Sequence, residues 1–252
     1  MSTSDPITEF ADFWRLFNFS RSELIHPNDD IALVRRSQFE LSLIPLPVVG
    51  DLRRPDVLIL MLNPGFDNSD VWWERENPCF RETLKRNLLQ DVRDSEYPLF
   101  YLDPQFAAHP GADYWYGDPS VTSTGTKRKQ RKLKRLVEAV SRFRGCSLGE
   151  ARREVAQKIA IVQQVPYHSR AFGSYDLLRH LYTARKAVQL IKALLGQKLI
   201  IATRAINHWG FSGPVNSTDL VVYPKSWATS ASLSPQSWGG AAILHRLLQN
   251  PS

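Results

Sequence analysis

Val57-Leu58-Ile59-Leu60-Met61-Leu62 runs directly into Asn63-Pro64-Gly65, and this stretch decides the fold class. An unbroken apolar run of this length predicts a strand buried on both faces, as in the parallel sheet of an α/β protein. A polar amide, a proline and a glycine end the run, so the chain turns where the strand's carboxyl end meets solvent. Open α/β sheets bind ligands at that edge, so Asn63 is well placed for chemistry.

Three further short apolar runs predict buried strands, with helices between them. These runs are Ile159–Val162, Leu199–Ala202 and Leu220–Val222. Strands that alternate with helices favour right-handed parallel crossovers. We therefore predict an α/β fold, a three-layer α/β/α sandwich with a central four-stranded parallel sheet.

Residues 1–252 are interpreted as one domain with a helical lead-in over residues 1–55 and an aromatic and basic insertion over residues 95–135. Prolines and glycines over residues 95–126 predict an irregular segment, and its many aromatic residues favour an ordered wall of a pocket. Helices are expected over Phe10–Phe17, Phe80–Asp91, a stretch ending near Phe143, a stretch from Ser147 with capping-box spacing, Ser174 to about Gly196, and Ser237–Gln249.

The composition is typical of a soluble globular protein, with 43% hydrophobic and 23% charged residues. No apolar stretch approaches the roughly 18 residues that span a bilayer, and the N-terminus lacks the features of a signal peptide. Cys79 and Cys146 alone do not make a disulfide framework. We expect a cytoplasmic monomer with two ordinary thiols and no membrane partner.

The positive charge is concentrated in one place. Removing the basic residues of this cluster leaves 25 basic residues against 25 acidic ones, so the whole net charge of +7 lies there. The alternative interpretation is a solvated helix face or loop, but such a concentration favours DNA as a partner. The cluster consists of Lys127, Arg128, Lys129, Arg131, Lys132, Lys134 and Arg135.

Parallel strands would deliver the residues that follow them to one edge of the sheet. This set offers amides, a phenol and a guanidinium, without a carboxylate pair or a Cys/His dyad. Its members are Asn63, Gln163, Gln164, Arg204 and Tyr223.

Other polar residues near these strand ends have two possible roles each. His168 could contact a phosphate or be structural, and Asp67 and Asp70 could be active-site acids or solvated loop carboxylates. The sequence contains no G-x-G-x-x-G, P-loop or zinc-deaminase signature. We expect no cofactor and no metal.

Amide side chains suit a nucleobase edge, because each offers both a donor and an acceptor. Five short motifs follow one another along the chain. They are Leu62-Asn63-Pro64-Gly65, Pro78-Cys79-Phe80, a strand ending in Gln163, Ala202-Thr203-Arg204-Ala205 and Val221-Val222-Tyr223-Pro224. This order resembles the uracil-DNA glycosylase superfamily, and its first motif is similar to the Gly-Ile-Asn-Pro-Gly of the mismatch-specific uracil/thymine branch.

The resemblance implies a role for several residues. Asn63 would hold the attacking water, Phe80 would stack on the flipped base, and Gln163, with Gln164 beside it, would read the base edge. The Gly65 N–H and the Tyr223 hydroxyl would stabilise negative charge on the departing base. Tyr223 stands where the family has His or Asn, and Gln163 is one methylene longer than the family's Asn, so a base other than uracil is possible.

DNA would be held by residues around this edge. The basic cluster, His168 and Arg204 would contact phosphates, and the loop with Lys225 and Ser226 would probe the minor groove. Trp227 or Leu233 would be the apolar wedge.

These features together predict a monofunctional DNA glycosylase acting on a modified or mismatched pyrimidine. One alternative is a non-catalytic nucleic-acid-binding protein of the same fold, and another is an α/β enzyme acting on small nucleotides. A third is a glycosylase that removes hypermodified bases from foreign (phage) DNA in defence rather than repair.

Overall fold

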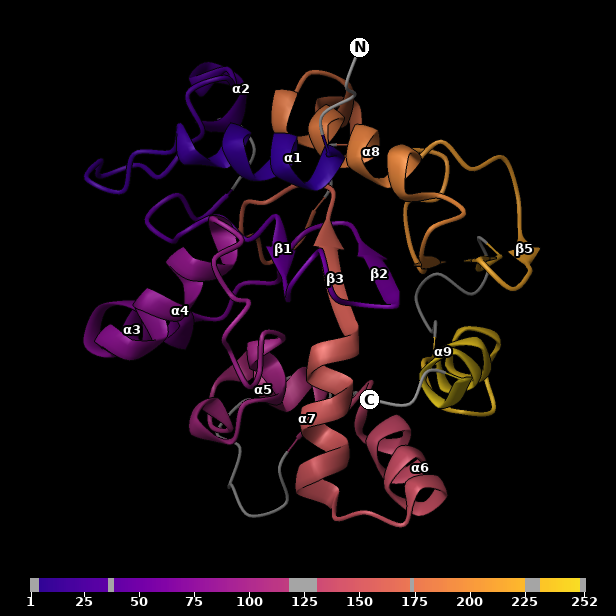
Figure 1. Ribbon diagram of the computed structural model, residues 1–252. Coiled ribbons are helices and arrows are strands. Elements are labelled where there is room, and N and C mark those ends of the chain that lie inside the picture. Colours follow the sequence, from indigo (N-terminus) through magenta and orange to yellow (C-terminus); the bar gives the residue numbers. More distant parts are fainter. Residues whose placement is uncertain (1–4, 36–38, 118–130, 173–174, 225–231, 250–252) are drawn as a thin grey trace.

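β2 (Val57–Met61) is a central strand of the sheet (Figure 1). The computed structural model describes residues 5–35, 39–117, 131–172, 175–224 and 232–249. β2 pairs in parallel with β3 (Ile159–Gln163) on one side and with β4 (Leu199–Ala202) on the other. Val57 through Leu60 have no exposed surface. The predicted strand and its burial on both faces are confirmed.

The sheet has the order β1-β3-β2-β4-β6-β5. β6 (Leu220–Val222) is parallel to β4, so four parallel strands form the centre as predicted. The edges are β1 (Val48–Val49), antiparallel to β3, and β5 (Val215–Asn216), antiparallel to β6. The prediction of only four strands is wrong, because the two edge strands are too short to leave a recognisable pattern in the sequence.

The register places branched apolar residues side by side across the sheet. Ile59 of β2 is level with Ile161 of β3 and Ile201 of β4, and none of the three has any exposed surface. Branched side chains pack well against their neighbours on a pleated surface, so this row forms the middle of the core.

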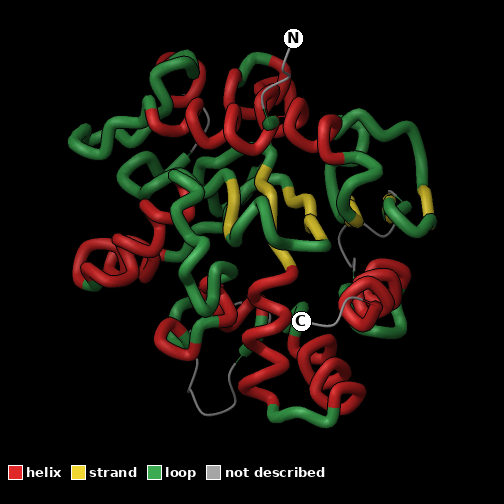
Figure 2. Tube along the Cα trace, in the orientation of Figure 1, coloured by secondary structure: helices red, strands yellow, loops and turns green. Residues whose placement is uncertain are grey.

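Helices lie on both sides of the strands: α1 and α8 together on one side, and α6, α7 and α9 on the other (Figures 1 and 2). This placement follows from the crossovers, since the connection from β2 to β3 and the one from β3 to β4 run in opposite directions along the sheet. The helices are α1 (Pro6–Arg15), α2 (Ile31–Arg35), α3 (Asn68–Glu76), α4 (Pro78–Leu88), α5 (Pro110–Trp115), α6 (Lys134–Arg144), α7 (Leu148–Lys158), α8 (Tyr182–Leu194) and α9 (Trp238–Gln249).

The predicted capping box of α7 is confirmed. The Ser147 hydroxyl accepts from the Glu150 N–H at 3.2 Å, and the Glu150 carboxylate accepts from the Ser147 N–H at 2.9 Å. α6 ends as expected at Gly145, whose φ of 64° lies in the left-handed region that glycine adopts without strain.

α8 begins later than the sequence predicts. Ser174, the expected cap, lies outside the described residues, and the 3₁₀ helix η3 (Tyr175–Arg179) follows it. Leu181 then takes an extended backbone, with φ −72° and ψ 123°, so the α-helix starts only at Tyr182. The extended backbone at Leu181 therefore divides into two helices the stretch that the apolar pattern predicts as one.

The segment expected to be irregular contains short helices. These are the 3₁₀ helices η1 (Phe100–Leu102) and η2 (Pro104–Phe106), followed by α5. η2 and α5 each begin with a proline, which is tolerated in a first turn because no N–H is needed there. Its described part, residues 95–117, is ordered as predicted, and Phe100, Tyr101 and Phe106 are buried.

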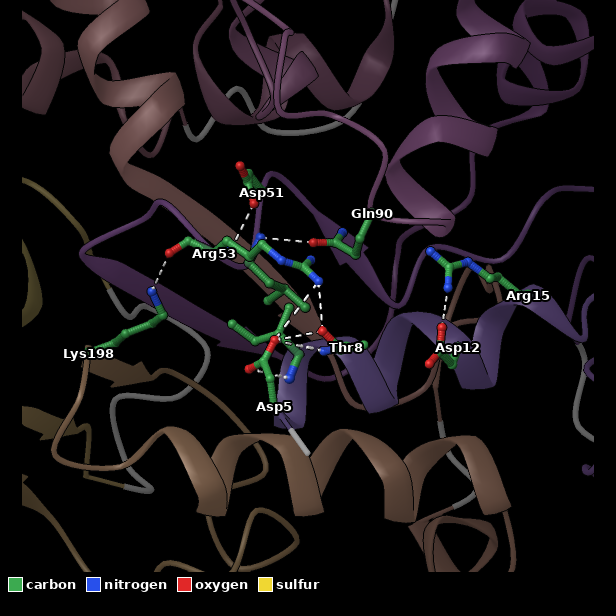
Figure 3. Close-up of polar contacts among 10 residues, drawn as sticks. Asp5, Thr8, Asp12, Arg15, Asp51, Arg53, Gln90 and Lys198 are labelled. Atoms are coloured by element: carbon green, nitrogen blue, oxygen red, sulfur yellow. Dashed lines mark hydrogen bonds and ion pairs between the residues drawn. The ribbon is translucent and has the colours of Figure 1, made fainter. Parts of the chain in front are cut away.

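Polar contacts fix α1 to the amino edge of the sheet (Figure 3). Arg53, before β2, donates from Nη2 to Thr8 Oγ1 at 3.0 Å. Lys198, before β4, donates from Nζ to the carbonyl oxygens of Arg53 at 3.1 Å and Pro55 at 2.8 Å. Asp5 caps α1 by accepting from the Thr8 N–H at 3.2 Å.

Among the described residues, no helix combines the length and the apolar character needed to cross a membrane.

Candidate functional site

The four central strands point the same way, so their carboxyl ends lie at one edge of the sheet. This edge carries Gln163 at the end of β3, Asn63 after β2, Arg204 after β4 and Tyr223 after β6. The chain crosses from β3 on one side of β2 to β4 on the other, which makes the β2/β4 boundary the topological switch point. Ligands of open α/β sheets bind at such a point, and Asn63 and Arg204 flank it.

The Asn63 side chain is held in one orientation. Its Nδ2 donates to the Pro64 carbonyl oxygen at 2.7 Å and to Ser169 Oγ at 2.9 Å. A carbonyl oxygen can only accept, so the amide nitrogen must face Pro64, and the assignment of the two amide atoms is fixed. Oδ1 is therefore the atom left to accept a hydrogen bond from a ligand or water.

The turn after β2 is joined to the segment after β3. Gly65 and Ser169 form a parallel bridge, with the Ser169 N–H donating to the Pro64 carbonyl at 3.3 Å. Arg170 donates to Asn68 Oδ1, and its guanidinium lies 5.2 Å from the centroid of the Phe66 ring. The turn after β2 and the segment after β3, which are distant in sequence, thus lie side by side. Together they form one rim of the site, which we call the lip.

His168 is buried beneath this lip. Its Nδ1 lies 3.0 Å from the Gly65 carbonyl oxygen, and its Nε2 lies 3.3 Å from the Ile44 carbonyl oxygen. Burial lowers the pKa of His168, opposed by the nearby Asp70 carboxylate. A neutral ring can donate to only one of the two carbonyls. Burial therefore favours the neutral ring, whereas hydrogen bonds to both carbonyl oxygens favour the protonated ring. These contacts support the structural role of His168 rather than a phosphate contact.

A buried carboxyl group lies behind His168. Both oxygens of Glu74 accept from the Ile44 N–H, at 3.1 and 3.0 Å, and Glu74 is 4% exposed. Burial raises the pKa of Glu74 to about 7, and the Ile44 N–H opposes the shift. The lip therefore rests on a chain of contacts from Glu74 through Ile44 to His168 and Gly65.

Gln163 and Gln164 are both buried, at 4% and 2% exposed. Gln164 Nε2 donates to the His208 carbonyl at 2.9 Å, which fixes the direction of its amide. Among the described residues, Oε1 of each glutamine is buried without a hydrogen-bond partner. An unsatisfied buried acceptor costs about 1–3 kcal/mol, so these two atoms are a local cost to the stability of the fold.

Phe80 does not present an open ring to a base. It is 3% exposed, and the His109 ring lies 4.5 Å from its centroid at an angle of 34°. Trp73, Phe100 and Phe106 surround it edge-on. Stacking of a base on Phe80 therefore requires His109 to move.

The two aspartates after the turn have structural partners. Asp67 caps α3 and Asp70 completes its capping box, accepting from the Asp67 N–H at 2.7 Å. His109 Nδ1 accepts from the Gly111 N–H at 3.0 Å, so its proton is on Nε2, which faces Asp70 Oδ1 at 3.3 Å. This neutral His109 tautomer and the Asp70 carboxylate form an oriented pair against the aromatic cluster.

The Tyr223 hydroxyl is already engaged. It donates to the Ser232 carbonyl and accepts from the Gly239 N–H at 2.9 Å. A side chain at position 239 would clash, since its Cβ would lie 2.8 Å from this hydroxyl. Tyr223 thus anchors the start of α9, and its predicted role at the leaving group would break these contacts.

The described part of the basic cluster lies just before α6 and in its first turn. Arg131, Lys132, Lys134 and Arg204 are half-buried, and Arg135 is exposed. Leu233, predicted as a wedge, is 1% exposed and belongs to the main core, so the structure does not support that role. The following residues predicted to bind DNA lie outside the described residues: Lys127, Arg128, Lys129, Lys225, Ser226 and Trp227.

Sequence reasoning missed Ser169, Arg170 and the partnership of Asp70 with His109. The spacing from Asp67 to Asp70 is that of a capping box and could have identified their structural role. Ser169 and Arg170 carry no local signal. Within the described part of the chain, no group of three or more His, Cys, Asp or Glu side chains is suited to a metal ion.

Comparisons with protein-family models, curated proteins and solved structures found no match to this chain.

Proposed function

We propose that this protein is a DNA glycosylase that takes one base out of DNA and hydrolyses its N-glycosidic bond, leaving an abasic site. The observation that carries the proposal is the orientation of Asn63 at the switch point of the sheet. Both donor contacts of its amide are made to Pro64 and Ser169, so Oδ1 is presented as an acceptor for one water. A base inside a duplex is out of reach, so it must be flipped out first.

The reaction then needs no strong base. The bond between the sugar's anomeric carbon and the base nitrogen breaks, and its electron pair leaves with the base. The water held by Asn63 adds its oxygen to the anomeric carbon, and the proton released passes to solvent or to the departing base. An amide cannot remove a proton from water in advance, so bond breaking leads and water attack follows.

The buried glutamines support a nucleobase as the group bound. Oε1 of Gln163 and Oε1 of Gln164 are acceptors of the kind that pairs with an N–H on a pyrimidine edge, and because both are buried, a base reaches them only when the neighbouring side chains move. Gly65 is exposed, and a Cβ built there would meet no described atom within 4 Å. The Gly65 N–H therefore remains our candidate for stabilising charge on the departing base, in place of Tyr223.

Stacking of a flipped base on Phe80 would require the displacement of His109. His109 lies against Phe80 where a flipped base would stack, and it is held there by Asp70 and Gly111. A base entering the site would exchange one flat ring for another on the face of Phe80. We propose a modified or mismatched pyrimidine as the substrate.

The direct test is base release from DNA containing uracil, mismatched thymine or hypermodified pyrimidines, detected by alkaline cleavage at abasic sites. Asn63→Ala should bind DNA normally and lose about 10²- to 10³-fold in base release, the range expected for loss of one positioned hydrogen-bonding group. Asn216→Ala, at an exposed position on β5, is the matched control and should behave as the wild type.

The outcomes separate the alternatives. Full base release by Asn63→Ala would remove Asn63 from the mechanism. DNA binding by the wild type without release of any of these bases would favour the non-catalytic nucleic-acid-binding protein. Release of hypermodified bases alone would favour a role in defence against foreign DNA.

A further inference from the structure

Tyr175 and His208 come from different connections of the sheet and form a stack of two rings. Their ring centroids lie 5.4 Å apart at an interplanar angle of 20°. Phe172 supports the Tyr175 ring from the side, at a centroid distance of 5.5 Å and an angle of 86°. Tyr175 is still 46% exposed, and His208 is exposed as well. The stack is therefore held in place by protein contacts while both rings remain accessible to solvent.

A hydrogen bond places this stack at the carboxyl edge of the sheet. Gln164 directly follows β3, and its Nε2 donates to the His208 carbonyl oxygen at 2.9 Å. Tyr175 begins η3, farther along the connection that starts at Gln164. The connection from β3 thus meets the one from β4, and because β2 lies between these two strands, they meet beside the end of β2. Asn63 follows β2, so the stack and Asn63 share one edge.

Arg170 lies on the connection that also carries Tyr175, at the lip. Ser169 Oγ accepts from Asn63 Nδ2 at 2.9 Å, so Arg170 is one residue from a direct partner of Asn63. The Arg170 guanidinium donates to Asn68 Oδ1 and lies 5.2 Å from the centroid of the Phe66 ring. Both groups are neutral, so these contacts orient the guanidinium without neutralising its charge. The Arg170 residue is exposed.

Accessible rings and an oriented guanidinium match the two parts of a nucleotide. A base of any identity can extend a stack of aromatic rings, because every base has a π-face. A guanidinium binds phosphate through paired N–H donors. A strand of nucleic acid presents both groups at each nucleotide. A protein partner with an apolar surface would cover the rings but offer no counterpart to the Arg170 charge, so the observations favour nucleic acid.

We propose that Tyr175 and His208 form a stacking platform for one unpaired base of a DNA strand, and that Arg170 binds a phosphate of the same strand. The base on the platform neighbours the one that is flipped towards Asn63, and this part of the proposal rests on the proposed function. Stacking itself does not, since it requires no bond to break. Single-stranded DNA offers unpaired bases throughout, whereas a duplex must first open a pair.

The experiment measures binding of the full-length protein to a labelled single-stranded DNA of ordinary bases, by fluorescence anisotropy over a range of salt concentrations. Tyr175→Ala and His208→Ala should each weaken binding at least about fivefold, the lower end of the loss expected when a stacked base loses its ring. Tyr175→Phe keeps the ring and should bind as the wild type. Phe143→Ala removes a ring that is 69% exposed near the end of α6 and is the matched control.

Salt dependence separates the phosphate contact from the stacking contact. Arg170→Gln should lower the slope of log affinity against log salt concentration by about 0.7, the value for one phosphate contact on a single strand. Tyr175→Ala should leave this slope unchanged, because a base carries no charge. A strand of the same length made of abasic sites keeps every phosphate, so Tyr175→Ala and the wild type should bind it equally.

Several results would overturn the proposal. They are wild-type affinity in Tyr175→Ala, an equal loss in Tyr175→Phe or in Phe143→Ala, an unchanged salt slope in Arg170→Gln, and tighter binding of RNA of the same sequence, which would make RNA the occupant. Absence of base release from every DNA tested, with the expected binding results intact, would contradict the glycosylase function alone, since this experiment requires no catalysis.

Discussion

The amino edge and the carboxyl edge of the sheet differ in how their polar groups are bonded. At the amino edge, Arg53 and Lys198 bond to Thr8 and to main-chain oxygens, although Asp51 Oδ2 there is buried without a hydrogen-bond partner among the described residues (Figure 3). At the carboxyl edge, Gln163 keeps a buried acceptor without a partner among the described residues, and Glu74 is buried with a raised pKa. The bonds of Arg53 and Lys198 at the first edge stabilise the fold, whereas Gln163 Oε1 and the charged form of Glu74 at the second edge weaken it. Proteins tolerate such local costs mainly where function requires them.

The largest expected effect comes from Glu74→Gln. The folded pKa of Glu74, about 7, lies above its ordinary value of 4.5, so the folded state holds this proton more tightly. The contribution of this group to stability is therefore complete below pH 4.5 and is lost as the pH rises through 7. Glutamine imitates the protonated carboxyl group, so Glu74→Gln should exceed the wild type in free energy of unfolding by on the order of 3 kcal/mol at pH 8.

Denaturant unfolding between pH 4.5 and pH 8 measures this difference, which should shrink towards the acidic end. Glu76→Gln, at an exposed position in the same helix, should show no such trend. A difference in unfolding free energy that stays constant with pH would mean that Glu74 does not titrate in this range. Glu74 would then not be an example of a destabilising group at the carboxyl edge.

The next effect in size is expected for Gln163→Met. It removes the unpartnered Oε1 while keeping a side chain of similar shape, so the free energy of unfolding should rise by about 1 kcal/mol. Base release should fall at the same time, because the acceptor that reads the base is gone. Gln189→Met, at an exposed position on α8, serves as the control and should change neither quantity. Destabilisation by Gln163→Met would show that this amide serves the fold.

The smallest effect, with the opposite sign, is expected for Arg53→Ala at the amino edge. Loss of the bond to Thr8 and of the 3.9 Å ion pair with Asp5 should lower the free energy of unfolding by about 0.5–1 kcal/mol. Base release should not change. Arg15→Ala breaks an exposed pair with Asp12 on α1 and should change stability by less than that. Thermal unfolding of the two variants, side by side, decides whether the amino edge stabilises the fold.

The central strands could be predicted because burial on both faces leaves an unbroken apolar run, as in β2. The edge strands could not, since two residues such as Val48 and Val49 carry no periodic signal. Prolines were interpreted as breaks over residues 95–126, although Pro104 and Pro110 start short helices there.

The candidate site was predictable where a residue lies at the end of a strand or just beyond it. Asn63 comes two residues after the end of β2 and Gln163 is the last residue of β3, and both reach the carboxyl edge for that reason alone. The contact of Asn63 with Ser169 depends on how two loops lie against each other, which no local pattern records. Leu233 could not be assigned correctly either, because an apolar residue in a serine-rich loop fits both a core position and an exposed wedge.

The brevity of β1 and β5 has a consequence for the behaviour of this protein at high concentration. Each outermost strand offers only two residues of backbone, and each runs antiparallel to its neighbour. A second copy would find too few free amide and carbonyl groups in these strands to extend the sheet across a molecular boundary. Crowding should therefore not drive this chain into the edge-to-edge stacks from which fibrous aggregates grow.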